Sequence, residues 1–212
     1  GVFLRPPRSP PLTTRLRMSP IVAIVGRPNV GKSRLFNRLT RRRISIVHDH
    51  PGVTRDIISA DVDGYTLLDT GGFGLAPGDT PSKIVKAVDA QVMFAVEMAH
   101  LIVFVVDAQQ GLAPVDEDIA KRLRKSGKKV VLVVNKVDHP RHDAAVTEAF
   151  RLGLGHPVAV SAEHGHGEED VRLHITRALD LPDDAPETEP VAAADRRLRI
   201  CFIGRPNVGK SS

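Results

Sequence analysis

The chain has 212 residues, 42% of them hydrophobic, one cysteine and a formal net charge of +5. This composition allows one or two domains with a real core, contains no apolar run of the ~18 residues that a membrane helix needs, and excludes a disulfide framework or a cysteine-based zinc site. Four arginines in residues 1–17 carry +4 of the charge, so the rest is nearly neutral and gives no indication of nucleic-acid binding.

Residues 1–17 are rich in proline and arginine and show no apolar period, and we expect them to be disordered. Because they lack acidic residues, they are compatible with a targeting peptide. Alternatively, they lie upstream of the native start, since Met18 stands just before the first apolar run. Mass spectrometry of the native N-terminus distinguishes the two possibilities.

From residue 18 to residue 180, apolar runs typical of strands alternate with helical patterns. The expected strands are 21–25, 57–62, 65–68, 101–106, 130–134 and 158–160. The expected helices lie near 32–41, 82–99, 116–126, 142–152 and 168–180. This alternation predicts an α/β fold, with a mainly parallel six-stranded sheet and helices on both faces. Ligands bind at the carboxyl ends of the strands in such folds.

A phosphate-binding sequence, Gly-Arg-Pro-Asn-Val-Gly-Lys-Ser, follows the first expected strand and fits G-x-x-x-x-G-K-[ST]. Gly26 and Gly31 permit a tight turn that points backbone N–H groups at a polyphosphate, and the next helix adds its N-terminal dipole. Lys32 supplies charge for the β- and γ-phosphates, and the Ser33 hydroxyl is a ligand for Mg²⁺. The predicted nucleotide contacts are Gly26, Arg27, Pro28, Asn29, Val30, Gly31, Lys32 and Ser33.

Two later segments complete the predicted phosphate site. Thr54, in a Pro-Gly-Val-Thr-Arg-Asp segment, is the candidate that closes on Mg²⁺ and the γ-phosphate, although an ordinary polar loop is the alternative. Asp69 ends an expected strand and is placed to hold Mg²⁺, and the backbone N–H of Gly72 is placed to contact a γ-phosphate. The predicted nucleotide contacts here are Asp69, Thr70, Gly71, Gly72 and Phe73, and the predicted metal ligands are Ser33, Thr54 and Asp69.

The pattern N-K-x-D follows a further expected strand and indicates selection of guanine. The Asp138 carboxylate can accept hydrogen bonds from both N1–H and the 2-amino group, a pattern that adenine does not offer, while the Lys136 stem can cover the ring. This disfavours an ATP-using kinase. Ser161 and Ala162 follow the last expected strand, where their backbone can meet guanine O6. The predicted base contacts are Asn135, Lys136, Val137, Asp138, Ser161 and Ala162.

Histidines are numerous enough to suggest a metal site. None of them forms the i,i+4 helical pair with an intervening acid that a zinc protease needs. We therefore expect solvated loop residues at His48, His50, His139, His142, His156, His164 and His166.

The C-terminal part of the chain changes character. Residues 181–197 are acidic and interrupted by three prolines, which predicts a solvated linker. Residues 204–211 then repeat the phosphate-loop sequence of residues 26–33 after another apolar run. One strand and one loop cannot bury a core. We therefore expect residues 198–212 to be the first strand and phosphate loop of a truncated second domain, unable to bind a nucleotide specifically.

The motifs G-R-P-N-V-G-K-S, P-G-V-T-R-D, D-T-G-G-F, N-K-V-D and S-A-E-H-G, in this order, resemble the Der (EngA) family of GTPases. The repeated phosphate loop is the most specific element, and the resemblance covers residues 18–212. It implies Era-like G domains in tandem followed by a KH-like domain, with residues 18–180 as the first G domain. It also implies a cytoplasmic assembly factor for the large ribosomal subunit, monomeric and independent of membranes.

The expected reaction is hydrolysis of GTP to GDP and phosphate, with GTP or GDP and Mg²⁺ as ligands. Many G domains orient the attacking water with Gln after D-x-x-G, and here that residue is Phe73, so we expect slow turnover, on the order of 10⁻⁴ to 10⁻² s⁻¹. The resemblance implies that Asn29 binds a stimulating K⁺. The alternative is a GTP/GDP-dependent binding switch with incidental hydrolysis. The expected catalytic residues are Lys32, Thr54, Gly72 and Asn29.

Overall fold

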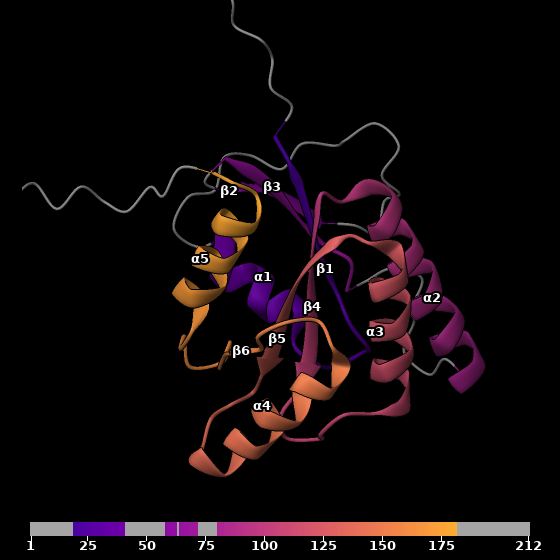
Figure 1. The fold of residues 1–212 in the computed structure, drawn as a ribbon, viewed down its shortest axis with the longest axis vertical. Helices are drawn as coiled ribbons and strands as arrows, with labels where there is room; N and C mark the ends of the chain where they lie inside the picture. The colour runs from indigo at the N-terminus through magenta and orange to yellow at the C-terminus, as the bar shows by residue number, and fades with distance from the viewer. Residues whose placement is uncertain (1–18, 41–57, 63, 72–79, 182–212) are drawn as a thin grey trace, which may run out of the picture.

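A six-stranded sheet forms the centre of the part of the chain that the computed structural model describes, residues 19–40, 58–62, 64–71 and 80–181 (Figure 1). Its order is β2-β3-β1-β4-β5-β6, and only the β2–β3 pair is antiparallel. The predicted, mainly parallel sheet is therefore confirmed. The strands are β1 (Ile21–Val25), β2 (Ile58–Val62), β3 (Tyr65–Asp69), β4 (Leu101–Asp107), β5 (Lys129–Asn135) and β6 (Val158–Ala159).

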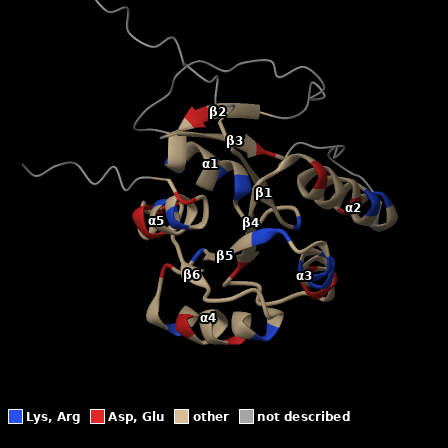
Figure 2. Cartoon of the chain, turned by 45° about the horizontal axis from the view of Figure 1, so that its top comes forward, with Lys and Arg blue, Asp and Glu red and all other residues tan. Residues whose placement is uncertain are grey.

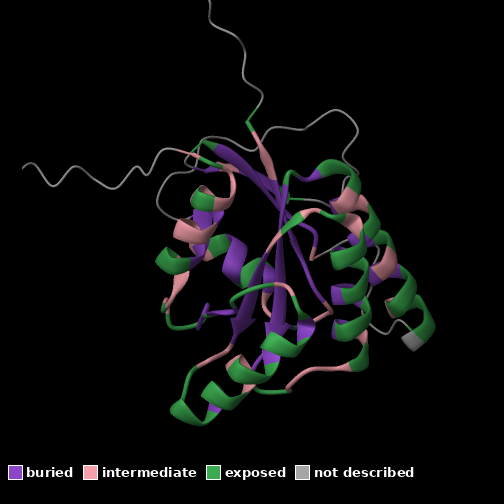
Figure 3. Cartoon of the chain, viewed as in Figure 1, coloured by how far each residue is buried: buried purple, intermediate pink, exposed green. Residues whose placement is uncertain are grey.

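The inner strands are apolar almost throughout because both faces of the sheet are covered. Every residue of β4 is buried, and so are the last five residues of β5 (Figure 3). Continuous apolar runs of this kind are typical of parallel strands between two helical layers. The register of β4 and β5 brings their last residues, Asp107 and Asn135, side by side.

Helices cover both faces of the sheet (Figure 1). Helices α1 and α5 pack into one core, and α2, α3 and α4 pack into the other. The outward faces of the helices are largely exposed (Figure 3). The helices are α1 (Lys32–Thr40), α2 (Pro81–Met98), α3 (Pro114–Ser126), α4 (Asp143–Ala149) and α5 (Glu168–Ala178).

The observed boundaries differ from the predicted ones at several ends. Strands β3, β4 and β5 each continue for one residue, so that a polar side chain ends each strand: Asp69, Asp107 and Asn135. The segment predicted as one helix, 142–152, is α4 between two 3-10 turns, η1 (Pro140–His142) and η2 (Phe150–Leu152). Gly153 ends it in the left-handed region, with φ of 63°.

The carboxyl ends of five parallel strands lie at one edge of the sheet, where such folds bind ligands. The predicted N-terminal extension, most of the linker and the second phosphate loop lie outside the described residues. Leu181, predicted as the first linker residue, instead packs against the core beside α5. Among the described residues, no helix is long and apolar enough to cross a membrane.

Candidate nucleotide-binding site

The loop after β1 has a conformation that its two glycines make possible. Gly26 has φ of 152° and Gly31 has φ of 94°, and both are tightly surrounded. A Cβ on Gly26 would stand 2.4 Å from the Val105 carbonyl oxygen, and one on Gly31 would stand 2.3 Å from Asn135 Nδ2. Any larger residue at these positions would therefore push the loop away from its neighbouring strands.

Lys32, the first residue of α1, is buried with only 4% of its surface exposed. Its ammonium donates to the carbonyl oxygens of Gly26 at 2.7 Å and Arg27 at 2.8 Å. Burial lowers the pKa of Lys32 to about 8, although the carboxylates of Asp69 and Asp116 act in the opposite direction. Within the described part of the chain, the Lys32 ammonium has only neutral carbonyls as hydrogen-bond partners, and a buried cation of this kind is well placed to bind an anion.

Two of the predicted Mg²⁺ ligands lie together beside Gly71. A Cβ on Gly71 would stand 2.8 Å from Ser33 Oγ and 2.9 Å from Asp69 Oδ1, so both oxygens border the same small space. Asp69 is buried and accepts a hydrogen bond from the Gly71 N–H at 2.8 Å. A hydroxyl and a carboxylate are the hard oxygen ligands that Mg²⁺ takes. The predicted residues Thr54, Gly72 and Phe73 lie outside the described residues.

Gln91, a buried residue of α2, joins the phosphate loop to the strand that carries Asp69. Its amide oxygen accepts from the Gly26 N–H at 3.3 Å, and its amide nitrogen donates to the Thr70 carbonyl at 2.5 Å. The Thr70 hydroxyl in turn donates to the Ile24 carbonyl of β1. No sequence motif indicated Gln91; the available signal was a single amide among the apolar residues of a long helix.

Arg27 fixes the other side of the phosphate loop to the start of α3. Its guanidinium donates to Asp116 Oδ2 at 3.1 Å, to Gln110 Oε1 at 2.6 Å and to the Gly111 carbonyl at 3.2 Å. Burial raises the pKa of the fully buried Asp116, while the Ala113 N–H and Arg27 oppose the rise. The predicted contact residue Arg27 therefore points to the start of α3 in this structure, and no sequence motif indicated its partner Asp116.

Asn135 connects the phosphate loop to the segments that follow β5 and β6. Its amide nitrogen donates to the Val30 carbonyl at 2.8 Å, and its amide oxygen accepts from the Ala162 N–H at 3.0 Å. Asn135 is buried, so both of its polar groups depend on these partners. Three predicted motifs that are distant in the sequence thus meet at one side chain.

The carboxylate of Asp138 is exposed and hydrogen-bonded at both oxygens. Ser161 Oγ donates to Oδ1 at 2.5 Å, and Gln109 Nε2 donates to Oδ2 at 3.0 Å. Its neighbour Lys136 has φ of 66° and pairs with Asp107 Oδ2 at 2.6 Å. The structure brings the predicted base contacts Asp138 and Ser161 together, and Asp107 and Gln109 are further residues of the same cluster that the motifs did not indicate.

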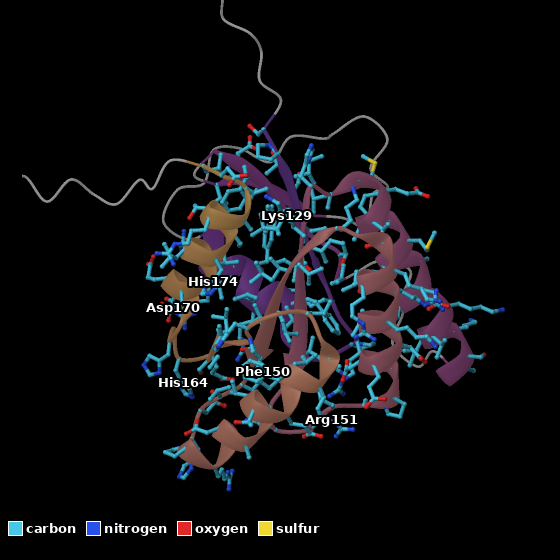
Figure 4. The ribbon with its side chains drawn as sticks, viewed as in Figure 1. Lys129, Phe150, Arg151, His164, Asp170 and His174 are labelled. Carbon is cyan, nitrogen blue, oxygen red and sulfur yellow. The ribbon has the colours of Figure 1, made fainter. Side chains whose placement is uncertain are left out.

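One of the predicted solvated histidines is buried, and this part of the prediction is wrong. His142 is 8% exposed, and its Nδ1 accepts a hydrogen bond from the Asp138 N–H at 3.2 Å. The 3-10 turn Pro140–His142 brings the His142 ring back to the backbone of Asp138. By contrast, His164 lies at the periphery, in the turn before α5 (Figure 4). The described residues contain no cluster of histidine, cysteine or acidic side chains that would hold a metal ion.

A hollow of about 410 Å³ lies beside Ser33 and Ala162, between α1 and the loop after β6. Arg38 joins its two walls by donating to the Ala162 carbonyl at 2.9 Å, and Arg34 pairs with Glu163 at 2.5 Å across its rim. Elsewhere on the surface, basic and acidic residues are mixed on α3 and α5 (Figure 2). One predicted phosphate contact, Ser33, and one predicted base contact, Ala162, thus line the same hollow.

Known proteins share this sequence and fold. A family model described as "50S ribosome-binding GTPase" matches residues 21–136. The GTPase Der of Clostridium botulinum is 48% identical over 197 residues, which make up 91% of this chain and 43% of that protein. The GTPase Der of Syntrophotalea carbinolica is 48% identical over 196 residues, with the same coverage. The chain therefore spans less than half the length of these curated relatives.

Solved structures give the same result for the fold. Era from Aquifex aeolicus, bound to GDP and aluminium fluoride, aligns with a TM-score of 0.56 and 30% identity, over 77% of this chain and 57% of that one. Era in complex with MgGDPNP and a segment of 16S ribosomal RNA aligns with a TM-score of 0.52 and 27% identity, over 80% of this chain and 59% of that one. Both are G-domain GTPases.

The family model covers more than half of the chain, and the residues that it matches include the phosphate loop, Asp69 and the start of the N-K-x-D motif. On this evidence, and with a sheet that aligns with solved G domains, the chain belongs to the family of 50S ribosome-binding GTPases.

Proposed function

We propose that this chain is the GTP-binding and GTP-hydrolysing domain of a GTPase that acts in assembly of the large ribosomal subunit. The nucleotide part of the proposal is supported by the site, and the ribosomal part by the family description and the Der relatives. We further infer a monomer that works in the cytoplasm. Light scattering of the purified chain tests the oligomeric state.

The observation that carries the proposal is the position of Asn135. It lies between the Val30 carbonyl of the phosphate loop and the Ala162 N–H of the loop after β6, and Asp138 follows it by three residues. A ligand bound here would place phosphates at the start of α1 and a base beside Asp138. Guanine has two adjacent donors for a carboxylate, and adenine does not, so Asp138 favours guanine.

Binding of the phosphates would draw the Lys32 ammonium away from the carbonyls of Gly26 and Arg27. The loop N–H groups and the N-terminus of α1 would hold the remaining oxygens. Ser33 and Asp69, with Thr54, would hold Mg²⁺, which supplies positive charge to the β- and γ-phosphates. These residues bind and orient the substrate, and Phe73 provides no hydrogen bond to an attacking water, so unassisted hydrolysis would be slow.

The base contact is tested by Asp138→Asn. An amide in place of the carboxylate no longer accepts both guanine donors, whereas it can donate to the 2-oxo group of xanthine. We expect GDP affinity to fall by about a hundredfold and XDP affinity to rise, both measured by calorimetry. Asp170→Asn, an exposed change in the first turn of α5, is the matched control (Figure 4). Unchanged preference for GDP would contradict the proposed base contact.

Hydrolysis is tested by phosphate release from GTP in K⁺ and in Na⁺. Asn29 has φ of 64° and is exposed on the phosphate loop, where its side chain is available to a cation. We expect faster release in K⁺, and Asn29→Ala should remove the difference while GDP binding persists. Equal rates in both salts would contradict the role of K⁺. Only trace release in both salts, with normal GTP binding, would favour the alternative, a binding switch with incidental hydrolysis.

The ribosomal part concerns the parent protein, because the chain matches 43% of its Der relatives. Co-sedimentation with large ribosomal subunits tests it, with this chain compared against a version that continues beyond Ser212. We expect the longer protein to bind in the presence of a GTP analogue. Failure of the longer protein to bind under any nucleotide condition would contradict the ribosomal role and leave the nucleotide site unaffected.

A further inference from the structure

We propose that Asp107, the last residue of β4, is a positioning residue for guanine recognition. It holds Lys136 directly and supports Asp138 through Gln109. The inference rests on the proposed function, because it concerns how the same base contacts are kept in place. None of the nucleotide motifs contains Asp107 or Gln109; Asp107 ends β4, and Gln109 lies in the turn between β4 and α3.

The first contact is an ion pair between neighbouring strand ends. Asp107 stands beside Asn135 in the parallel register, and the Ala108 N–H donates to the Asn135 carbonyl at 2.9 Å. The Asp107 side chain is completely buried, and its Oδ2 lies 2.6 Å from Lys136 Nζ. A short, charge-assisted bond to a buried carboxylate is strong, and a buried carboxylate without its partner is costly. The pair therefore fixes the Lys136 ammonium at the strand end.

This restraint acts on a residue whose backbone is already unusual. Lys136 is a non-glycine residue with φ of 66° and is partly exposed, so neither its backbone preference nor deep burial holds it. Without Asp107, the ammonium would be free to move into solvent, and the aliphatic stem would move with it. With Asp107, the stem stays where it can lie along the face of a bound base.

The second contact runs through the turn. Asp107 Oδ1 accepts the N–H groups of Gln109 at 2.8 Å and Gln110 at 3.2 Å, which closes a tight turn after β4. In this turn the Gln109 amide donates to Asp138 Oδ2 at 3.0 Å, while Ser161 occupies Oδ1. Each carboxylate oxygen has two acceptor positions, so Asp138 retains one on each oxygen for the two guanine donors. Gln109 and Ser161 thus orient the carboxylate and leave room for the base.

The substitution Asp107→Asn separates the two contacts. The amide oxygen still accepts the N–H groups of the turn, whereas the negative charge that holds Lys136 is gone. We expect the Kd for GDP, measured by calorimetry on the 212-residue chain, to rise about tenfold or more. Asp118→Asn, an exposed change on α3, should leave the Kd unchanged. If Asp107→Asn leaves the Kd unchanged while the unaltered chain binds GDP normally, the positioning role of Asp107 is wrong and the proposed function still stands.

A double-mutant cycle shows whether Asp107 acts through Lys136. In a Lys136→Met background, which keeps an apolar stem and removes the charge, Asp107→Asn should change the Kd for GDP less than about twofold. The same tenfold loss in both backgrounds would mean a general structural role and would overturn the inference. If thermal unfolding shows that Asp107→Asn is not folded, Asp107→Ser replaces it. The serine hydroxyl keeps an acceptor for the N–H groups of the turn, and the expected changes in Kd are the same.

Failure of the proposed function has a different signature. The unaltered chain would then show no GDP binding, and Asp138→Asn would have no effect. A chain that binds GDP with the expected preference but is insensitive to Asp107→Asn would retain the proposed function and lose only this positioning role.

Discussion

The phosphate side and the base side of the site are built by different means. On the phosphate side, the loop Gly26–Ser33 owes its form to backbone conformation, and its one buried cation, Lys32, is bonded to the loop's own carbonyls. On the base side, side chains bond to side chains: Asp138 to Ser161 and Gln109. Under the proposed function, we expect the first arrangement to change when a ligand binds, whereas the hydrogen bonds of the second are already formed.

The difference follows from what each side has to recognise. A polyphosphate presents charge in every direction, so a turn of N–H groups and one movable ammonium are sufficient. A base is distinguished from another base by one or two hydrogen-bonding groups, and discrimination at that level needs acceptors with fixed directions. Asn135 is hydrogen-bonded to both sides, so its side chain holds the phosphate loop and the loop after β6 in a defined relative position.

The largest change in nucleotide affinity is expected for Lys32→Ala, on the phosphate side. Removal of the only ammonium that is buried in the loop should weaken GTP binding by about a hundredfold or more. The nucleotide-free chain should unfold at the same or a higher temperature, because a desolvated cation has been removed. The control is Lys129→Ala on β5, which removes an exposed ion pair with Asp180 and should leave GTP binding unchanged. A loss of less than about tenfold would contradict the phosphate role of Lys32.

Gly31→Ala tests the contact between the two sides. The new Cβ would collide with Asn135 Nδ2 and would sit on a backbone with φ of 94°. We expect the free energy of unfolding to fall by about 1–3 kcal/mol, together with GDP affinity, as the Asn135–Val30 bond is displaced. Gly127→Ala, where φ is 67° and no atom lies within 4 Å, isolates the backbone cost. Equal losses in both variants would show that the Asn135 contact is unimportant.

The pH dependence of binding tests the movable cation. The pKa of Lys32 is lowered to about 8 in the free protein, and phosphate binds the charged form. Affinity for GDP should therefore be constant below about pH 7 and fall above pH 8 by up to about tenfold per pH unit. In Lys32→Arg the guanidinium stays charged, so the remaining binding should lose this slope. A slope that persists in Lys32→Arg would assign the pH dependence to another group.

The smallest effect is expected for Gln109→Ala, which removes one neutral donor from Asp138. A single hydrogen bond contributes about 0.5–1.5 kcal/mol, so the Kd for GDP should rise about two- to tenfold. A fall in Kd would instead mean that the amide competes with guanine for the carboxylate. Gln110→Ala, whose amide oxygen contacts Arg27 on the phosphate side, provides the comparison from the same turn.

The sequence was sufficient for the sheet because the parallel strands are continuous apolar runs. The motif residues that the structure describes lie at or just after strand ends, and their roles remain predictions. The sequence failed where a side chain depends on a distant segment. Gln91, Asp107 and Asp116 each contact residues more than 20 positions away, and no local pattern specifies such partners. His142 was misjudged for a different reason: its partner Asp138 is only four residues away, but its burial depends on the 3-10 turn Pro140–His142, which the predicted single helix did not include.

Gln91 has a mechanical consequence. One amide on α2 accepts from the Gly26 N–H and donates to the Thr70 carbonyl, so the helix is attached to both walls of the phosphate site by the same rigid planar group. A displacement of α2 large enough to stretch one of these bonds must pull the loop, pull the strand end, or break the connection. Gln91 lies inside α2 rather than at one of its ends, so we expect a movement of this part of the helix to act on the phosphate loop through the amide.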